Sequence, residues 1–376
     1  MLDSGPDAML ELNAPDIQPE DLAAVARVLE GKRLLAGPEI ARFEAAVAEA
    51  VGANHAVAVS SGTAALVLAL QAAGVGPGDE VLVPAFTFLA TAHAVVLVGA
   101  TPVLVDVDPR TWNLDPGEAA RAITSRTTAI LPVDQFGLPV EVEPLLMLRR
   151  RDGLALTLIE DAACAVGAAR HGRPVGAGPG TACLSFHPRK IITTGEGGMV
   201  LTDEAGLADR IRQLRTLGRD GSGRFVEVGP NLRMTELGAA LGRSQLGRLP
   251  ALVERRRALA TRYRSRLHGH PRLRLQAEPP GLRHCYQTFA LCLGPELDRA
   301  MVIASLARDR VQAGVATYGV HRELPYRSDE RIAAQPLPVA DELAARGLAL
   351  PLHPGMTESE VDRVCAALER ALEARP

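Results

Sequence analysis

Lysine is nearly absent from this sequence. Of its 41 Lys and Arg residues, only Lys32 and Lys190 are lysines. An arginine guanidinium stays protonated at every pH that a cell reaches, whereas a lysine amine can lose its proton and act as a nucleophile. The preference for arginine therefore makes each retained lysine a candidate for chemistry. Lys190 lies in the segment LSFHPRKIITTGEGGMV (184–200), and we predict that it does chemistry which arginine cannot do.

Long apolar runs, an excess of one charge and paired cysteines are also missing. The longest apolar segments, such as AHAVVLVGA, are too short to cross a bilayer, and no targeting pattern begins the chain. A formal net charge of -3 gives no electrostatic reason to expect nucleic acid or an anionic membrane as a partner. The five cysteines are scattered without metal-ligand spacing, which predicts reduced thiols, no metal site and a cytoplasmic protein.

Apolar periodicity predicts an α/β fold. Strands are expected at 55–60, 79–85, 101–108, 127–135 and 156–161, and helices at 21–31, 39–52, 63–74 and 87–99. Strands that alternate with helices favour a mostly parallel sheet covered on both faces. Ligands of such sheets collect at the carboxyl ends of the strands.

The pattern changes near residue 250, and the length of 376 residues favours two domains. We predict a large domain over 1–250, which includes the N-terminal segment, and a smaller α+β domain over 251–376. The second domain begins with an Arg-rich helix at 251–270 and has expected strands at 284–293 and 311–319.

Three features together indicate pyridoxal 5'-phosphate (PLP). The segment SSGTAAL (60–66) offers backbone N–H groups at a helix start, where a phosphate can bind. Asp161 ends a predicted strand and offers a carboxylate to the ring nitrogen, while Lys190 offers the amine that the aldehyde needs. Each feature alone also has an ordinary structural explanation: a helix N-cap, a solvated strand end and a lysine retained by chance.

The same segments resemble the DegT/DnrJ/EryC1/StrS aminotransferases, which use PLP on mostly sugar substrates. The resemblance covers nearly the whole chain, in family order, through GPEIARFE, SSGTAAL, VPAFTFLATAHAVVLVGATPVLVDVD, IEDAA, SFHPRKIITTGEGGMV, NLRMTELGAALGRSQLGRL and LPLHPGMTESEVDRV. It implies a PLP-dependent transferase of fold type I, like aspartate aminotransferase, with a large domain and a C-terminal small domain. It also implies a homodimer with shared active sites.

The resemblance assigns roles to individual positions. Lys190 would form the Schiff base with PLP and then carry the proton, and Asp161 would pair with the pyridine nitrogen. Phe88 would lie against the ring, although core packing between Phe86 and Leu89 is an alternative. The remaining cofactor contacts would come from Gly62, Thr63 and Ser185 at the phosphate, Cys164 at the phenolic oxygen and Asn231 of the partner subunit at the phosphate. Asn231 has an alternative as the N-cap of a helix that begins near Thr235. His187 and His321 are candidate substrate contacts.

The sequence departs from the family pattern around this site. Cys164 stands where relatives usually have Gln or His, and a thiol is a weak hydrogen-bond donor. The segment Asp134–Phe136 replaces a common polar pattern, and Leu217 and Gly238 replace a frequent His and Gln. The resemblance therefore implies PLP more strongly than it implies one substrate.

The expected reaction moves an amino group from an amino acid, L-glutamate in most relatives, to a keto sugar. A nucleotide-linked keto-deoxysugar is the leading substrate, for polysaccharide or secondary-metabolite biosynthesis, and a keto-cyclitol is the alternative. Related sugar dehydratases have histidine at the lysine position, so Lys190 disfavours that activity. An alternative of another class is a catalytically silent regulatory relative.

Overall fold

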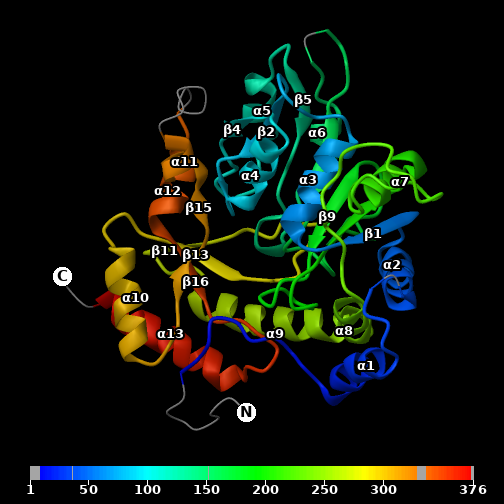
Figure 1. Cartoon of the computed structure of the whole chain (residues 1–376). Helices are drawn as coiled ribbons and strands as arrows, with labels where there is room; N and C mark the ends of the chain where they lie inside the picture. Colours follow the sequence, from blue (N-terminus) through cyan, green and yellow to red (C-terminus); the bar gives the residue numbers. More distant parts are fainter. Residues whose placement is uncertain (1–8, 36, 151, 328–335, 374–376) are drawn as a thin grey trace.

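The computed structural model describes residues 9–35, 37–150, 152–327 and 336–373. A seven-stranded sheet forms the centre of the larger part, in the order β1-β10-β9-β6-β5-β2-β4 (Figure 1). Its strands are β1 (His55–Val59), β2 (Glu80–Pro84), β4 (Thr101–Val105), β5 (Thr127–Ile130), β6 (Thr157–Asp161), β9 (Thr181–Ser185) and β10 (Gly198–Thr202). Only β10 runs against its neighbours, and the pairs from β4 to β9 are parallel. The prediction of a mostly parallel sheet is confirmed.

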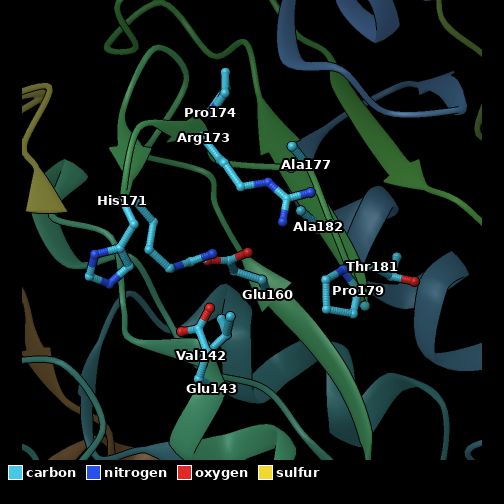
Figure 2. A pocket seen from close by; sticks show the side chains of 14 residues that line it. Val142, Glu143, Glu160, His171, Arg173, Pro174, Ala177, Pro179, Thr181 and Ala182 are labelled. Carbon is cyan, nitrogen blue, oxygen red and sulfur yellow. The ribbon is translucent and has the colours of Figure 1, made fainter. Parts of the chain in front are cut away.

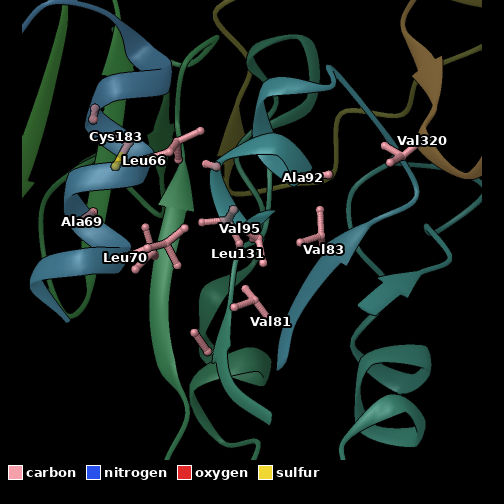
Figure 3. Close-up of a cluster of buried hydrophobic side chains, with 14 of the residues drawn as sticks. Leu66, Ala69, Leu70, Val81, Val83, Ala92, Val95, Leu131, Cys183 and Val320 are labelled. Atoms are coloured by element: carbon pink, nitrogen blue, oxygen red, sulfur yellow. The ribbon is translucent and has the colours of Figure 1, made fainter. Parts of the chain in front are cut away.

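Helices cover both faces of this sheet. One face packs against α3 (Gly62–Ala72), α4 (Ala90–Leu97) and α7 (Ala205–Leu214). Figure 3 shows part of this core, to which α3 contributes Leu66 and Leu70 and β2 contributes Val81 and Val83. The other face packs against α2 (Pro38–Val51), α5 (Pro116–Ala122), α6 (Val142–Leu146), α8 (Glu236–Leu246) and the start of α9 (Leu249–Leu267), and α1 (Pro19–Glu30) lies on α8. Because alternate strand residues face opposite layers, both faces are apolar.

A second, antiparallel sheet has the order β11-β13-β16-β14. Its strands are β11 (Leu273–Leu275), β13 (Phe289–Leu293), β14 (Gly314–Val315) and β16 (Gly347–Leu350). It shares a core with the later part of α9, with α10 (Arg299–Arg308) and with α13 (Glu358–Glu373). Leu10 belongs to this core, and its N–H donates to the Arg310 carbonyl at 2.9 Å. The N-terminal segment thus packs on the small sheet, and the division at residue 250 stays a prediction.

The remaining elements are short. They are β3 (Phe86–Thr87), β7 (Ala169–Arg170), β8 (Arg173–Pro174), β12 (Leu282–Arg283), β15 (Tyr318–Gly319), α11 (Leu324–Arg327), α12 (Pro338–Arg346) and two 3-10 turns at Gln135–Gly137 and Val320–Arg322. Among the described residues, no helix is long and apolar enough to cross a membrane.

Several predicted boundaries are wrong. The strand expected at 311–319 is two strands, because the chain leaves the small sheet after β14 and pairs through β15 with β3 of the large domain. The strand expected at 284–293 starts only at Phe289, since Tyr286 has a left-handed backbone with φ 51°. The strand expected at 127–135 ends at Ile130, and the helix expected at 87–99 begins at Ala90. Strands β9 and β10 were not predicted at all.

Candidate active site

The N-terminus of α3 forms a cradle that suits a phosphate. The hydroxyl of Ser61 accepts the Ala64 N–H at 3.1 Å, so Ser61 is the N-cap. The first N–H groups of the helix, at Gly62 and Thr63, have no acceptor within the helix and point outward with the positive end of its dipole. A Cβ at Gly62 would lie 2.8 Å from the Ser185 Cβ, so the glycine lets the Ser185 hydroxyl approach this helix end. Capping and anion binding are therefore compatible here.

Asp161 lies at the carboxyl end of β6, beside the strand that ends at Ser185. Its Oδ2 accepts the Thr91 hydroxyl at 2.7 Å and its Oδ1 accepts the Ala163 N–H at 3.1 Å. Burial raises the pKa of Asp161, while these hydrogen bonds and the charge of Lys190 oppose the rise. A protonated pyridine nitrogen beside the carboxylate would favour its charged form further. Thr91 was missed because its segment predicts only an apolar helix.

Lys190 lies close to Cys164. The Lys190 Nζ donates to the Cys164 Sγ at 3.1 Å, which joins the loop after β9 to the loop after β6. The other lysine, Lys32, is exposed just after α1. The structure therefore brings Lys190, Cys164 and Asp161 into one region, as the predicted roles require.

Residues from distant segments hold the loop that carries Lys190. The Gln287 Nε2 donates to the Arg189 carbonyl at 2.9 Å, and the Asn13 Nδ2 donates to the Pro188 carbonyl at 3.5 Å. The buried Arg256 guanidinium donates in turn to the Asn13 Oδ1 at 3.1 Å and to the Gln287 carbonyl at 3.1 Å. Helix α9, the segment before β13 and the N-terminal segment thereby position the loop that carries Lys190, which no local sequence pattern indicates.

Phe88 lies on the surface, with 56% of it exposed. Its ring centroid is 6.3 Å from that of Tyr318 in β15, whereas Phe86, two residues earlier, is 1% exposed. The alternative of core packing for Phe88 is therefore wrong, since Phe86 fills the core. An exposed ring beside Thr91 is available to lie against a cofactor, and that role stays a prediction.

Asn231 is exposed, and its side chain has no hydrogen-bond partner among the described residues. The helix cap is Thr235, whose hydroxyl accepts the Gly238 N–H at 3.1 Å. The alternative that Asn231 caps this helix is therefore wrong. The segment before it exposes four apolar side chains: Leu217, Phe225, Val226 and Val228. Val228 is 92% exposed, which is unusual for an apolar residue and typical of a surface that a partner covers.

The two candidate histidines differ. His187 lies on the Lys190 loop, where its Nδ1 accepts the Arg189 N–H at 3.1 Å, and burial lowers its pKa. His321 pairs through Nε2 with the Asp341 Oδ1 at 2.9 Å, and its buried Nδ1 has no partner among the described residues. Their substrate contacts stay predictions.

The segment Asp134–Phe136 is buried. The Asp134 Oδ1 accepts the Val140 N–H at 2.8 Å and lies 4.0 Å from the Arg170 guanidinium, which also pairs with Glu160. Burial and the Glu160 charge raise the pKa of Asp134 well above its usual range, although Arg170 opposes them. Nearby, Figure 2 shows Glu143, Glu160 and Arg173 lining a pocket that contains no predicted site residue. This buried segment packs beside β6, where the Asp134 N–H donates to the Asp161 carbonyl at 3.1 Å. An effect of its departure from the family pattern on specificity stays a prediction.

The raised pKa of Asp134 leads to a prediction about the stability of the fold. The unfolded chain releases the Asp134 proton at lower pH than the folded chain, so rising pH through this range destabilises the fold. Asp134→Asn should remove this pH-dependent destabilisation. Near neutral pH its free energy of unfolding should equal or exceed that of the unaltered protein. Arg170→Met should lower the free energy of unfolding by about 3–5 kcal/mol, because Glu160 loses its buried partner. Denaturant titrations at several pH values measure the free energy of unfolding of both variants. Equal losses of stability in Asp134→Asn and Arg170→Met would contradict this account of the cluster.

Comparison with known proteins decides the family. The sequence profile of the DegT/DnrJ/EryC1/StrS aminotransferase family matches residues 15–369. The chain belongs to this family. It is 41% identical over 344 residues to GDP-perosamine synthase of Caulobacter vibrioides, which covers 89% of this chain and 91% of that protein. The aminotransferases of this family depend on PLP, so both the predicted enzyme class and the predicted cofactor are confirmed.

Solved structures of aminotransferases have the same fold. The S. venezuelae protein DesV, solved with a ketimine intermediate, is 37% identical with a TM-score of 0.89, and the match covers 95% of each chain. The PLP form of the sugar aminotransferase Spr1654 of Streptococcus pneumoniae is 27% identical with a TM-score of 0.92, over 97% of this chain and 99% of that one. The fold-type-I prediction is confirmed.

The described residues fit PLP. The backbone N–H groups at Gly62, where a Cβ would collide with Ser185, suit the phosphate of PLP. The buried Asp161 carboxylate can accept from the protonated ring nitrogen, and the Lys190 amine can react with the aldehyde. No group of three or more His, Cys, Asp or Glu side chains that could hold a metal occurs within the described ranges.

The thiol at Cys164 leads to a prediction about the pH dependence of the cofactor absorbance. Cys164→Gln introduces a stronger donor, which should stabilise the deprotonated phenolic oxygen and lower its pKa. A net hydrogen bond of about 1 kcal/mol corresponds to a shift of just under one pH unit. The pH dependence of the cofactor absorbance measures this shift. An unchanged titration in a folded Cys164→Gln protein would place Cys164 away from the cofactor.

Proposed function

We propose that this protein transfers an amino group from L-glutamate to a nucleotide-linked keto-deoxysugar. The observation that carries the proposal is Lys190, held beside Cys164 and Asp161 in a chain similar to GDP-perosamine synthase over most of its length. That relative's name refers to a GDP-linked amino sugar, so a GDP-linked keto sugar is the first substrate to test. Its product would serve the synthesis of a polysaccharide or a secondary metabolite.

Each residue has a separate task in this reaction. PLP, when bound, takes up the amino group and accepts electrons from the α-carbon. Lys190 would hold the cofactor through its Nζ and would carry the proton from the α-carbon. Asp161 keeps a proton on the ring nitrogen, and Thr91 fixes its carboxylate in place. The first turn of α3 and Ser185 bind the phosphate.

We also propose that the active unit is a homodimer with shared sites. A phosphate dianion needs more donors than the α3 cradle and Ser185 supply, and the exposed amide of Asn231 can donate without adding charge. The apolar segment 217–228 gives a second copy of the chain a surface to cover. In this arrangement Asn231 of each subunit reaches the phosphate in the other site.

A substrate panel tests the function. The amino form of the enzyme is mixed with GDP-, UDP- or dTDP-linked keto-deoxysugars or with keto-cyclitols, and return of the cofactor's original absorbance reports transfer. We expect the largest rate with a GDP-linked keto sugar. A response to keto-cyclitols alone would replace the sugar nucleotide with a cyclitol as the substrate. A cofactor absorbance that changes with no donor or acceptor would favour a catalytically silent relative.

A further inference from the structure

The five cysteines differ in their access to oxidants. Four are buried: Cys183, Cys285, Cys292 and Cys365. Burial raises the pKa of Cys285 and of Cys365 to about 12 and raises those of Cys183 and Cys292 as well, so these thiols stay protonated. Cys164 is half-buried. Because oxidation needs access to the sulfur, Cys164 is the thiol best placed to react with a peroxide.

Cys164 is also the cysteine that touches an amine. Its Sγ accepts the Lys190 Nζ at 3.1 Å, so the two atoms are already at contact distance. Both loops are held by hydrogen bonds, because the Cys164 carbonyl accepts the Cys285 thiol at 3.2 Å and the Lys190 N–H donates to the His187 carbonyl at 2.8 Å. The flexible four-carbon stem of Lys190 can close the remaining distance to the sulfur while both loops keep these hydrogen bonds.

We propose that Cys164 and Lys190 form an oxidation-sensitive pair that hydrogen peroxide links covalently. Peroxide first oxidises the Cys164 thiol to a sulfenic acid and is itself reduced to water. The Lys190 nitrogen then attacks the sulfur, the S–O bond breaks, and the hydroxyl leaves as water with one amine proton. The product has an S–N bond between the two side chains. Two thiols reverse it, because the first takes the sulfur as a mixed disulfide and frees the amine, and the second restores the Cys164 thiol.

This link would disable the enzyme at its cofactor lysine. A linked Lys190 nitrogen cannot hold PLP, so this consequence rests on the proposed role of Lys190. The link itself depends only on the contact between the two side chains. A Lys190 that already holds PLP has no free amine for the sulfenic acid, so PLP should protect the pair. Cofactor-free protein should react readily.

Peptide mass spectrometry of peroxide-treated, cofactor-free protein tests the proposal. We expect the peptides that contain Cys164 and Lys190 to be joined, with two hydrogens fewer than their sum, and to separate after treatment with excess thiol. The link should be lost in Cys164→Ser and Lys190→Ala and retained in Cys285→Ser. Addition of PLP before peroxide should abolish it in the unaltered protein.

Three outcomes would overturn the proposal. One is a Cys164–Cys285 disulfide, another is Cys164 sulfinic acid without a link, and the third is unreacted Cys164. Because mass reports the link, this test is independent of the substrate panel. A link in a protein that transaminates no substrate would leave this inference standing and remove the proposed function. Transamination by a protein that forms no link would leave the proposed function standing and remove this inference.

Discussion

Hybrid dimers of two inactive chains should regain activity. One chain carries Lys190→Ala and lacks the amine, and the other carries Asn231→Asp, whose carboxylate repels the cofactor phosphate. If Asn231 acts across the interface, one site of each hybrid combines an intact Lys190 with an intact Asn231. The other site carries both lesions. The hybrid should therefore have one functional site of two, with about half the kcat per dimer that the unaltered protein shows.

Different affinity tags on the two chains allow the hybrids to be isolated from the parental dimers. Asn231→Gln is a matched control, because it keeps the amide without the charge and should reduce activity less than Asn231→Asp. If Asn231 acts within its own chain, every site in the hybrid keeps one lesion. Hybrids that form but stay silent would therefore exclude the shared-site dimer.

Replacement of Lys190 should have the largest effect of any single change. Lys190→Ala removes both the covalent attachment of the cofactor and the proton carrier, and a positioned proton carrier alone contributes about 10²–10⁴-fold to a rate. We expect kcat to fall by about 10³-fold or more in a protein that still folds. Lys190→Arg should be equally inactive, because a guanidinium keeps its charge and does not condense with an aldehyde.

Borohydride reduction separates this prediction from simple misfolding. In the unaltered enzyme borohydride should fix the cofactor to the peptide that contains Lys190, and in Lys190→Ala no label should remain. Lys32→Ala is the matched control, since Lys32 is exposed after α1 and should keep both label and activity. A label that maps to Lys32 would contradict the assignment.

The sequence predicted the layers of the fold because burial follows local periodicity. Strands β1, β2, β4 and β6 and helices α2, α3 and α9 lie where their apolar spacing indicates. Strands β9 and β10 were missed because their apolar runs, ACL and MVL, are only three residues long. Strand β2 is equally short and buried, but its run continues through VLVPA. The strand expected at 311–319 failed for a different reason, since a change from one sheet to another has no local signature.

The candidate site shows the same limit. Lys190 and Asp161 stand out through residue type and position, and the contact between Gly62 and Ser185 agrees with a phosphate cradle. Thr91 and Gln287 could not be predicted, because each acts on a residue far away in the chain. The sequence marks Asp134 only as a departure from the family pattern, and its burial beside Arg170 is seen only in the structure. Long-range polar contacts, and the burial that they require, become visible only in three dimensions.

Transfer of heavy nitrogen tests the central claim most directly. The enzyme is incubated with PLP, a GDP-linked keto-deoxysugar and L-glutamate labelled with heavy nitrogen, and the sugar nucleotide is weighed by mass spectrometry. We predict that the sugar gains one labelled amino group, that 2-oxoglutarate appears in equal amount, and that Lys190→Ala abolishes both. If the enzyme binds PLP at Lys190 but the sugar stays unlabelled, also when UDP- and dTDP-linked keto-deoxysugars are supplied, the claim that this protein is a sugar-nucleotide aminotransferase is contradicted.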